Sequence, residues 1–408
     1  MKHIASPDPS PTPGQSGARA DAPDPFDFYD IAELLTVEER LVRQTVRDLV
    51  ESDVLPTIEE HFRAGTFPRE LIPRLGSLGL LGATVPEEYG GAGLGPVANG
   101  LIMLELERGD SGVRSFASVQ GSLVMYPILR YGSEEQKRTW LPRMAAGEAI
   151  GCFGLTEPDH GSDPGGMETR AERRGARWIL KGRKMWITNG GLSEVAVVWA
   201  KTSEGFRGFL VPTNSRGFST VDMHNKWSLR ASVTSELVLE DVEVPDEARL
   251  PGATTLGAPL SCLNQARYGI SWGVIGAALA CYDTARRHAL ERTQFGKPIG
   301  SFQLVQAALA EMVTDITQAQ LIALRLGRLK EAGRDHPARV SLAKRRNVAM
   351  ALDIARSARE VLGAIGITGE VPIMRHLMNL ETVKTYEGTH QIHTLVLGHA
   401  VTGIEAYR

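Results

Sequence analysis

The middle of the chain has a different residue pattern from its two ends, and this change constrains the fold more than any other feature. Between about residues 151 and 250, short apolar runs, of which 195–200 is the clearest, are separated by Gly, Asn, Ser and Pro. This pattern is typical of short β-strands joined by turns. On both sides of this region, apolar residues recur at the three- and four-residue spacing of helices. The order helical, β, helical predicts an α+β fold.

Four segments are expected from this pattern. Residues 1–25 are rich in Pro, Ser, Gly, Ala and Asp, which predicts a disordered tail. Residues 26–150 predict an N-terminal all-α domain, residues 151–258 a β-sheet domain, and residues 259–408 a C-terminal four-helix bundle. The tail lacks the apolar core of a signal peptide, and its scarcity of arginine argues against a transit peptide.

Local signals place several of the expected helices. Thr36 and Glu39 have the spacing of a capping box, and Asp110 is positioned to cap the helix that follows it. The stretch 111–131 is expected to be one helix. The C-terminal bundle is expected from four long periodic stretches, Arg267–Leu290, Phe302–Ala332, Val340–Leu362 and His390–Tyr407.

Composition excludes several functional classes. The chain has 408 residues, of which 42% are hydrophobic and 23% charged, as is ordinary for a globular protein. A net charge of −3 gives no basic footprint for nucleic acid or an acidic membrane. The longest apolar runs are too short to span a membrane. Three cysteines and the lack of ligand spacing predict neither disulfides nor a metal site, and together these features favour a cytoplasmic protein.

One carboxylate near the C-terminus has unusual neighbours. Glu387 lies between Tyr386 and Gly388, so it combines an aromatic side chain with a residue that permits a sharp backbone bend. A poorly solvated carboxylate at such a bend can act as a general base with a tuned pKa. The alternative is an ordinary solvated glutamate at the end of a loop.

Three further patterns suit a bound cofactor. The loop 155–163 offers backbone N–H groups and hydroxyls, Trp186 and Thr188 combine an indole with a hydroxyl, and Arg292 and Gln303 can bind a pyrophosphate or adenine. Each has a structural alternative: a polar turn, a core tryptophan, or a basic loop between helices. No Gly-x-Gly-x-x-Gly follows a strand, which argues against a Rossmann nucleotide site.

Together, in order and spacing, these motifs resemble the acyl-CoA dehydrogenase family over about residues 27–408. The resemblance implies helical, β and helical-bundle domains around FAD, usually in a homotetramer. Arg292 and Gln303 would reach FAD from a neighbouring subunit. One departure is 360–366, where Glu360 and Ala364 replace the Gln and second Gly of the family's Gln-x-x-Gly-Gly-x-Gly. The flavin contacts implied by the resemblance are Phe153, Leu155, Thr156, Ser162, Trp186, Ile187, Thr188, Arg292, Gln303 and Thr389.

Within that family, the stretches 114–120, 263–269 and 385–390 resemble the branch that acts on glutaryl-CoA. Arg114 and Ser118 lie four residues apart on one helix face, among apolar residues, where they can clamp a carboxylate. An ordinary surface arginine is the alternative. The resemblance makes Glu387 the catalytic base. It implies a substrate site formed by Glu107, Arg114, Ser118, Ser162, Leu260, Asn264, Arg267, Tyr386 and Gly388.

The implied reaction is the oxidative decarboxylation of glutaryl-CoA to crotonyl-CoA and CO2. Glu387 would take the α-proton, FAD would accept hydride from the β-carbon, and the backbone N–H of Glu387 with a ribityl hydroxyl would bind the thioester oxygen. An electron-transferring flavoprotein would accept the electrons. The alternatives are oxidation of another short-chain or dicarboxylic acyl-CoA without decarboxylation, an oxidase that uses O2, and a flavin-free binding module.

Overall fold

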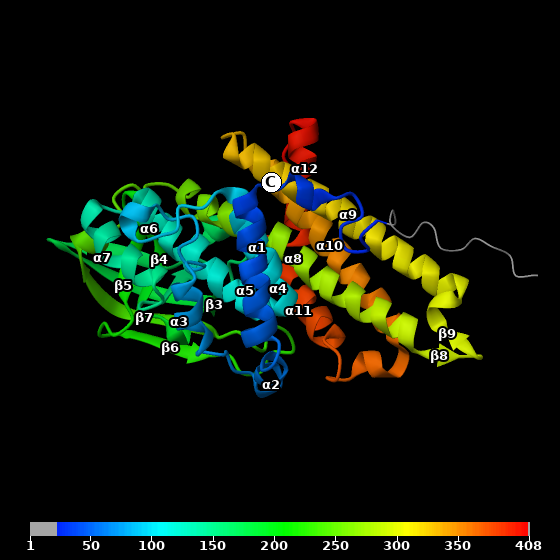
Figure 1. Ribbon diagram of the computed structural model, residues 1–408. Helices are drawn as coiled ribbons and strands as arrows, with labels where there is room; N and C mark the ends of the chain where they lie inside the picture. Colours follow the sequence, from blue (N-terminus) through cyan, green and yellow to red (C-terminus); the bar gives the residue numbers. More distant parts are fainter. Residues whose placement is uncertain (1–22, 407–408) are drawn as a thin grey trace, which may run out of the picture.

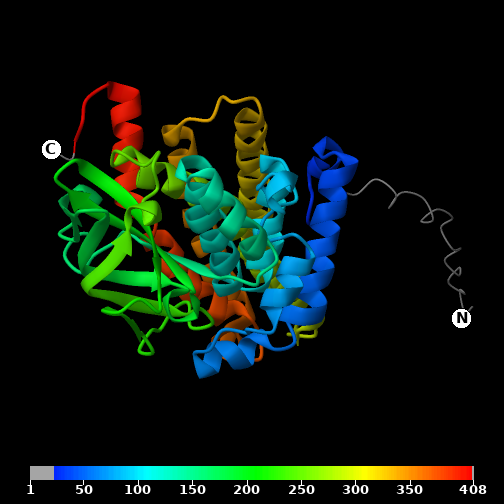
Figure 2. The same cartoon turned by 90° about the vertical axis from the view of Figure 1, so that its left-hand side faces the viewer.

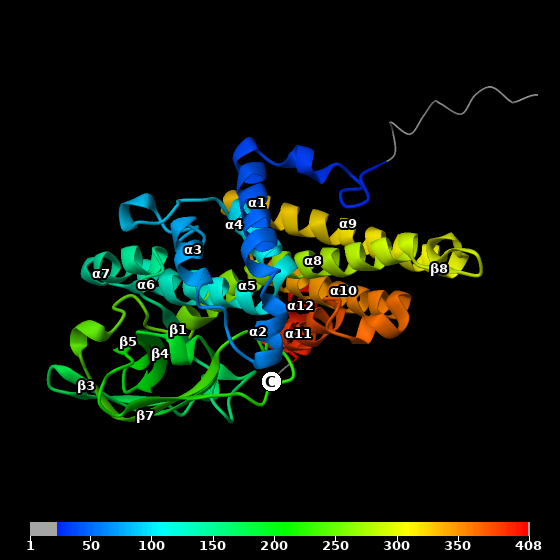
Figure 3. The same cartoon turned by 60° about the horizontal axis from the view of Figure 1, so that its bottom comes forward.

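The computed structural model describes residues 23–406, so most of the predicted tail, residues 1–25, lies outside the described residues. The N-terminal part is helical, as predicted, and packs beside the sheet (Figures 1 and 3). No helix within residues 23–406 is long and apolar enough to cross a bilayer. The N-terminal helices are α1 (Val37–Leu49), α2 (Ile58–Ala64), α3 (Leu71–Ser77), α4 (Pro96–Gly109), α5 (Ser111–Ser118), α6 (Tyr126–Tyr131) and α7 (Glu134–Ala145).

The predicted helix caps are present. Thr36 Oγ1 accepts from the N–H of Glu39 at 3.2 Å, and Glu39 Oε2 accepts from the N–H of Thr36 at 2.8 Å, which completes the capping box of α1. Asp110 Oδ1 accepts from the N–H of Gly112 at 2.6 Å and caps α5. The stretch expected as one helix over 111–131 is continuous, but its middle turn, Val119–Met125, is a π-helix between α5 and α6.

The central part of the chain is a seven-stranded sheet with strand order β1-β4-β2-β3-β7-β6, and β5 pairs with β4 outside this path. β1 and β2 run parallel to β4, and the other pairs are antiparallel. Figure 2 shows the sheet curled beside the helices. The strands are β1 (Gly151–Gly154), β2 (Arg170–Arg174), β3 (Arg177–Thr188), β4 (Val195–Thr202), β5 (Gly205–Pro212), β6 (Phe218–Asp222) and β7 (Thr234–Pro245).

The position of β4 in the fold explains why its sequence is continuously apolar. Val197 and Trp199 face the main core shared with the helices, whereas Ala196 and Val198 face a second core enclosed by the curled sheet. A strand buried on both faces needs apolar residues at every position rather than at alternate ones. The run 195–200 therefore marks the centre of the sheet.

β3 is one continuous strand that is interrupted by a bulge near its end. The register of β3 against β7 shifts between Lys184 and Ile187, where β3 contains one extra residue. Trp186 lies in this bulge with a φ of 63°, in the left-handed region. In a regular strand, residues two apart such as Trp186 and Thr188 would lie on the same face. A bulge changes the direction of the side chains beside it, so this rule does not apply here.

The C-terminal part is a helical bundle, as predicted, with one element that the periodicity did not reveal. α11 is that helix, and it leads directly into the turn that carries Glu387. α12 ends at Thr402, before the predicted Tyr407, because Gly403 (φ 74°) terminates it. The helices are α8 (Gly257–Glu291), α9 (Gln303–Glu331), α10 (Pro337–Leu362), α11 (Ile373–Thr385) and α12 (His390–Thr402), and a hairpin of β8 (Thr293–Gln294) and β9 (Lys297–Pro298) joins α8 to α9.

A buried polar junction joins the three parts of the fold. Asp110 Oδ2 accepts from Arg375 Nη1 at 2.8 Å and from Asn379 Nδ2 at 2.9 Å. Asn379 Oδ1 in turn accepts from the N–H of Leu229, in the loop between β6 and β7, at 2.8 Å. Asp110 precedes α5, and Arg375 and Asn379 lie on α11. The junction therefore fixes the helix that positions Glu387 against both the N-terminal helices and the sheet.

We predict that Asp110→Ala lowers the free energy of unfolding by about 3 kcal/mol, because it leaves the buried guanidinium of Arg375 without its closest carboxylate. Asp53→Ala is the control, since the Asp53–Arg74 pair is partly exposed and such pairs contribute at most about 1 kcal/mol. Urea unfolding followed by tryptophan fluorescence measures both. Equal effects of the two substitutions would contradict a stabilising role for the junction.

Candidate active site

Glu387 lies in a strained turn between α11 and α12. Its φ is 51° and that of Gly388 is 91°, so two successive residues adopt positive φ. Gly388 has no side chain to conflict with this, and a Cβ there would meet His393 Nε2 at 2.9 Å. Thr389 Oγ1 then accepts from the N–H of Ile392 at 3.2 Å and caps α12. Backbone strain of this kind concentrates at functional sites.

Two cations, the buried Lys344 and the partly buried Arg267, hold the carbonyl groups of this turn. Lys344 Nζ donates to Tyr386 O and to Gly388 O, both at 2.7 Å, and Arg267 Nε donates to Glu387 O at 2.7 Å. Lys344 lies on α10 and is 1% exposed. Sequence reasoning identified Arg267 but missed Lys344. Its spacing from Val340 and Val348 on the apolar face of α10 was the available signal.

The carboxylate of Glu387 is poorly solvated. Its Oε2 atom is buried and has no hydrogen-bond partner among residues 23–406. Burial raises the pKa of Glu387 above the ordinary carboxyl value, against the opposing charges of Arg114, Lys344 and Arg267. A desolvated base with an unpaired oxygen has lost the solvation that would weaken it, which suits proton abstraction from a weak carbon acid.

Arg114 forms a buried cluster next to Glu387. The guanidinium is 1% exposed and its Nε donates to Glu107 Oε2 at 2.6 Å, while Nη2 donates to the hydroxyl of Tyr386. The Ser115 hydroxyl lies 3.2 Å from the same Tyr386 oxygen. Burial lowers the pKa of Arg114, but Glu107 and Tyr386 together raise it by more, so the net pKa of Arg114 is raised. Burial raises the pKa of Tyr386 to about 12, so both groups keep their protons and remain donors.

Further predicted substrate residues surround this cluster. The buried atoms Ser118 Oγ and Asn264 Oδ1 have no hydrogen-bond partner among residues 23–406. A Cβ on Gly269 of α8 would lie 3.8 Å from Ser118 Oγ, so Ser118 faces α8, the helix that carries Asn264 and Arg267. Buried polar groups are normally satisfied, so these orphaned atoms indicate a place for a polar ligand. The side chain of Leu260 is exposed, at 36%.

The predicted flavin residues occupy one end of the sheet. The N–H of Met185 donates to Thr156 O at 2.8 Å, which joins the loop after β1 to the bulge that carries Trp186. The indole of Trp186 is 63% exposed, and Asn189 Nδ2 is buried without an acceptor in the described structure. An exposed indole can stack on a flat heterocycle. The unsatisfied amide of Asn189 could donate to a carbonyl group of such a heterocycle. Thr188 is partly exposed and Ser162 is exposed.

Other predicted flavin contacts have buried side chains. Phe153 and Leu155 belong to the main core, and Ile187 belongs to the core inside the sheet. Only their main chains can face a cofactor at this end of the sheet. Lys184 Nζ fixes this main chain by donating to Leu155 O at 3.1 Å and to Glu157 Oε1 at 2.8 Å.

Arg292 and Gln303 are not brought to this place within one chain. Both are exposed and flank the β8–β9 hairpin, at the opposite end of the molecule from the sheet (Figure 1). Apolar side chains are exposed beside them, since Phe295 is 92% and Leu304 87% exposed. This arrangement is expected of a surface that another subunit covers.

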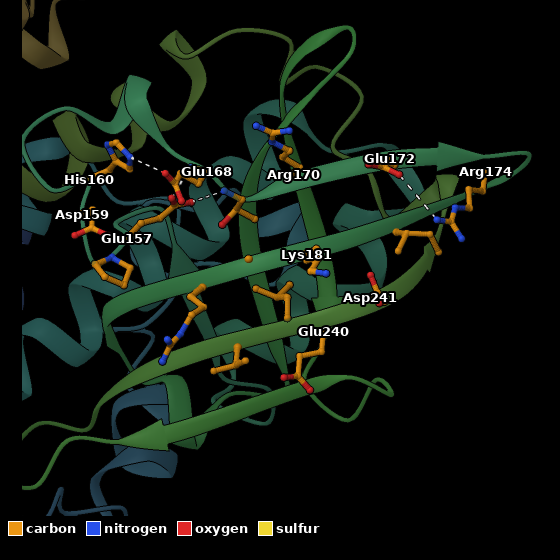
Figure 4. A pocket seen from close by; sticks show the side chains of 17 residues that line it. Glu157, Asp159, His160, Glu168, Arg170, Glu172, Arg174, Lys181, Glu240 and Asp241 are labelled. Carbon is orange, nitrogen blue, oxygen red and sulfur yellow. Dashed lines mark hydrogen bonds and ion pairs between the residues drawn. The ribbon is translucent and has the colours of Figure 1, made fainter.

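A groove of about 690 Å³ lies elsewhere, over β2, β3 and β7 (Figure 4). Its walls include charged side chains of both signs, among them Glu172, Arg174, Lys181 and Glu240, beside apolar residues of the strands. Glu387 does not line it. An acyl chain that entered this groove would desolvate several of these charges, so the groove is less suitable for the reacting part of such a substrate than the cluster around Glu387.

Comparison with known proteins agrees with the geometry. The family models for the N-terminal, middle and C-terminal domains of acyl-CoA dehydrogenase match residues 36–148, 152–242 and 256–402 in that order. The chain belongs to the acyl-CoA dehydrogenase family. This confirms the predicted α+β fold class. The domain boundaries at 150 and 258 remain predictions.

Individual relatives of this acyl-CoA dehydrogenase fall into two groups. The mitochondrial short-chain specific acyl-CoA dehydrogenase of Homo sapiens is 35% identical over 380 residues, which are 91% of this chain and 92% of that protein. A glutaryl-CoA dehydrogenase structure from Mycobacterium smegmatis is 57% identical with a TM-score of 0.93, covering 95% of this chain and 100% of that one. Another, in complex with FADH2, is 52% identical with a TM-score of 0.93, covering 94% and 99%.

The family establishes the general chemistry. This acyl-CoA dehydrogenase is an FAD-dependent enzyme that acts on an acyl-CoA thioester, which confirms the predicted cofactor. The role of each individual residue stays a prediction, because the comparisons do not test it.

We predict that Glu387→Gln abolishes bleaching of the flavin by an acyl-CoA substrate while FAD stays bound, because the amide keeps the shape but cannot accept the α-proton. In the unsubstituted protein, the bleaching rate should rise with pH through a midpoint above the ordinary carboxyl range, since only the carboxylate form is active and the pKa of Glu387 is raised. Stopped-flow absorbance measures both. Rapid bleaching of the Glu387→Gln protein would exclude Glu387 as the base.

Proposed function

We propose that this enzyme oxidises and decarboxylates glutaryl-CoA to crotonyl-CoA and CO2. The observation that carries the proposal is the buried guanidinium of Arg114 beside the base. Within residues 23–406, Nε and Nη2 of Arg114 donate to Glu107 and Tyr386, and Nη1 donates no hydrogen bond. The Nη1 group can therefore donate to the distal carboxylate of the substrate.

Glu387 performs the proton transfers. Its carboxylate accepts the α-proton of the thioester, and the electron pair of that C–H bond forms the new double bond. The raised pKa of Glu387 keeps the carboxylate basic enough for a weakly acidic carbon. Bound FAD supplies the acceptor for the hydride that leaves the β-carbon.

The end of the sheet holds the cofactor. The indole of Trp186 offers a stacking surface, and the hydroxyls of Thr156 and Thr188 offer donors at the same edge. The main chains at Phe153, Leu155 and Ile187 border this site. The hydroxyl of Thr389 accepts from Ile392 in the cap of α12 but keeps its own proton to donate.

Decarboxylation follows at the same place. The bond between the γ-carbon and the carboxylate breaks, CO2 leaves, and the electron pair is delocalised into the enoyl thioester. Glu387 returns its proton to the γ-carbon, which gives crotonyl-CoA. Glu107 lies 2.6 Å from Arg114 Nε, so it competes for the guanidinium and weakens its hold on the departing carboxylate.

A second candidate is oxidation of another short-chain or dicarboxylic acyl-CoA without loss of CO2. The observation that favours it is again the Glu107–Arg114 pair. Because Glu107 already neutralises Arg114, the pocket is not obliged to contain an anionic substrate. Product analysis separates the two candidates.

We further propose a homotetramer in which Arg292 and Gln303 of one subunit contact the FAD of another, and an electron-transferring flavoprotein as the electron acceptor. The exposed apolar residues around the hairpin support the first part, and the family resemblance supports both. Light scattering of the FAD-loaded protein checks the assembly, and a fully active monomer would refute it.

The decisive test is the product of a single turnover with glutaryl-CoA and a dye acceptor. We expect crotonyl-CoA and one equivalent of CO2 by mass spectrometry, because the protonated Glu387 is placed to protonate the γ-carbon. Accumulation of glutaconyl-CoA would instead show a dehydrogenase that stops before decarboxylation.

We predict that Arg114→Leu lowers kcat/KM for glutaryl-CoA about a hundredfold more than for butyryl-CoA, since a buried charge-assisted contact of this kind is worth on the order of 3 kcal/mol. The double substitution Glu107→Gln, Arg114→Leu avoids leaving a buried carboxylate unpaired. Arg138→Leu, at an exposed pair with Glu134, is the control. An equal loss for both substrates would make Arg114 structural.

A further inference from the structure

The turn that carries Glu387 has an unusual arrangement of its three successive carbonyl groups. The carbonyls of Tyr386 and Gly388 both accept from Lys344 Nζ at 2.7 Å, and the carbonyl between them accepts from Arg267 at 2.7 Å. Helix termini satisfy such groups with side chains, with water, with tightened backbone turns or with ligands. Here two cations from α8 and α10 hold all three.

The opposite side of the first peptide is open. Peptide bonds in the described chain are trans, so the N–H of Glu387 points away from the carbonyl of Tyr386 that Lys344 holds. Among residues 23–406, the N–H of Glu387 has no acceptor. It is therefore a preoriented donor adjacent to the carboxylate that abstracts the α-proton.

Lys344 is buried without a carboxylate partner, and its hydrogen bonds in the described structure go to two carbonyl groups of the Glu387 turn. It is 1% exposed, and no carboxylate of the described structure lies within 4.0 Å of its Nζ. Its neighbours Arg345 and Arg346 are only partly buried, and they donate to Thr394 and Asp315. A buried cation without an ion pair is costly, so its presence calls for a role that an apolar residue could not fill.

We propose that Lys344 is a positioning residue, which orients and polarises the Tyr386–Glu387 peptide so that its N–H stabilises the thioester oxygen as that oxygen gains charge. A cation on the carbonyl withdraws electron density from the amide, and this strengthens the N–H as a donor. Preoriented donors of this type act where negative charge develops in the transition state.

The groups around Lys344 act on its charge in opposite directions. Burial lowers the pKa of Lys344, against the charge of Glu387, while Arg267 on α8 and Arg114 on α5 also lower it. Tyr386 places its ring 5.9 Å from Nζ. From α12, His393 faces the same turn, and burial with the charges of Lys344 and Arg267 lowers its pKa to about 3, so it stays neutral.

The inference rests on the proposed site around Glu387, but it can be tested separately. Acetoacetyl-CoA has acidic α-protons and a carbonyl at its β-carbon, so it can form an enolate without losing hydride. Its ionisation on the FAD-loaded protein is followed by absorbance against pH. Lys344→Met removes the cation with little loss of volume, Lys344→Arg retains it, and Arg345→Met on the same helix is the control.

For Lys344→Met we expect the apparent pKa of bound acetoacetyl-CoA to rise by about one unit or more, a tenfold weaker stabilisation of the enolate. Bleaching by butyryl-CoA should slow at least about tenfold, with butyryl-CoA affinity changing less than about threefold. Lys344→Arg should recover part of both effects, and Arg345→Met should match the unsubstituted protein.

Two results would overturn the inference. One is an unchanged enolate pKa and bleaching rate in Lys344→Met. The other is a parallel loss of FAD content, butyryl-CoA affinity and rate in both Lys344 variants, which is the signature of a purely structural lysine. Repeating the enolate titration in the Glu387→Gln background separates the two hypotheses, because solvent can deprotonate acetoacetyl-CoA whether or not Glu387 is the base.

Discussion

The proposed chemistry depends on one electrostatic constraint: Glu387 must remain available as a carboxylate in a place where burial disfavours its charge. Burial opposes its ionisation, and three cations compensate, Arg114 from α5, Arg267 from α8 and Lys344 from α10. Each comes from a different helix, so the site exists only when the N-terminal helices and the bundle are packed together. Burial outweighs the three cations, so the pKa of Glu387 remains raised. A carboxyl group with a raised pKa is better suited to accept a proton than one held in a permanent ion pair.

Close packing between α8 and the N-terminal helices makes this convergence possible. Gly273 lies so close to the Glu107–Arg114 pair that a Cβ there would collide with Glu107 Oε2. Gly276 similarly lies against the backbone of α4 at Leu104. Because glycine has no side chain at these two positions, α8 can approach α4 closely. The ion pair is thereby held rigidly before any ligand arrives, which reduces the ordering cost of binding.

Different residues determine the fold and the substrate specificity. The three-part architecture holds FAD and a base, and any acyl-CoA dehydrogenase needs both. In the proposed function, the choice of a dicarboxylate rests on a few side chains next to Glu387, above all Arg114, Glu107 and Tyr386. Function must therefore be argued from these groups, because one architecture accommodates many substrates.

Signals that act over a few residues were readable in the sequence. The capping box at Thr36, the cap at Asp110 and the two-sided apolar run of β4 all correspond to what the structure shows. α11 was not recognised from the sequence, and its position is set by the buried contact between Asp110 and Arg375. The bulge at Trp186 was equally invisible, since pairing with β7 decides it.

By itself, the sequence determined the order of the domains, the family and the candidate base, because helix periodicity, caps and the motif around Glu387 are local. Only the tertiary structure decided which charges are buried. Lys344, Arg345 and Arg346 form one basic stretch, and nothing local marks the first of them as different. Lys344 alone of the three is enclosed, with its ammonium on the carbonyls of the turn that carries Glu387. Burial of a charge depends on what packs against it, and that is a property of the assembled helices.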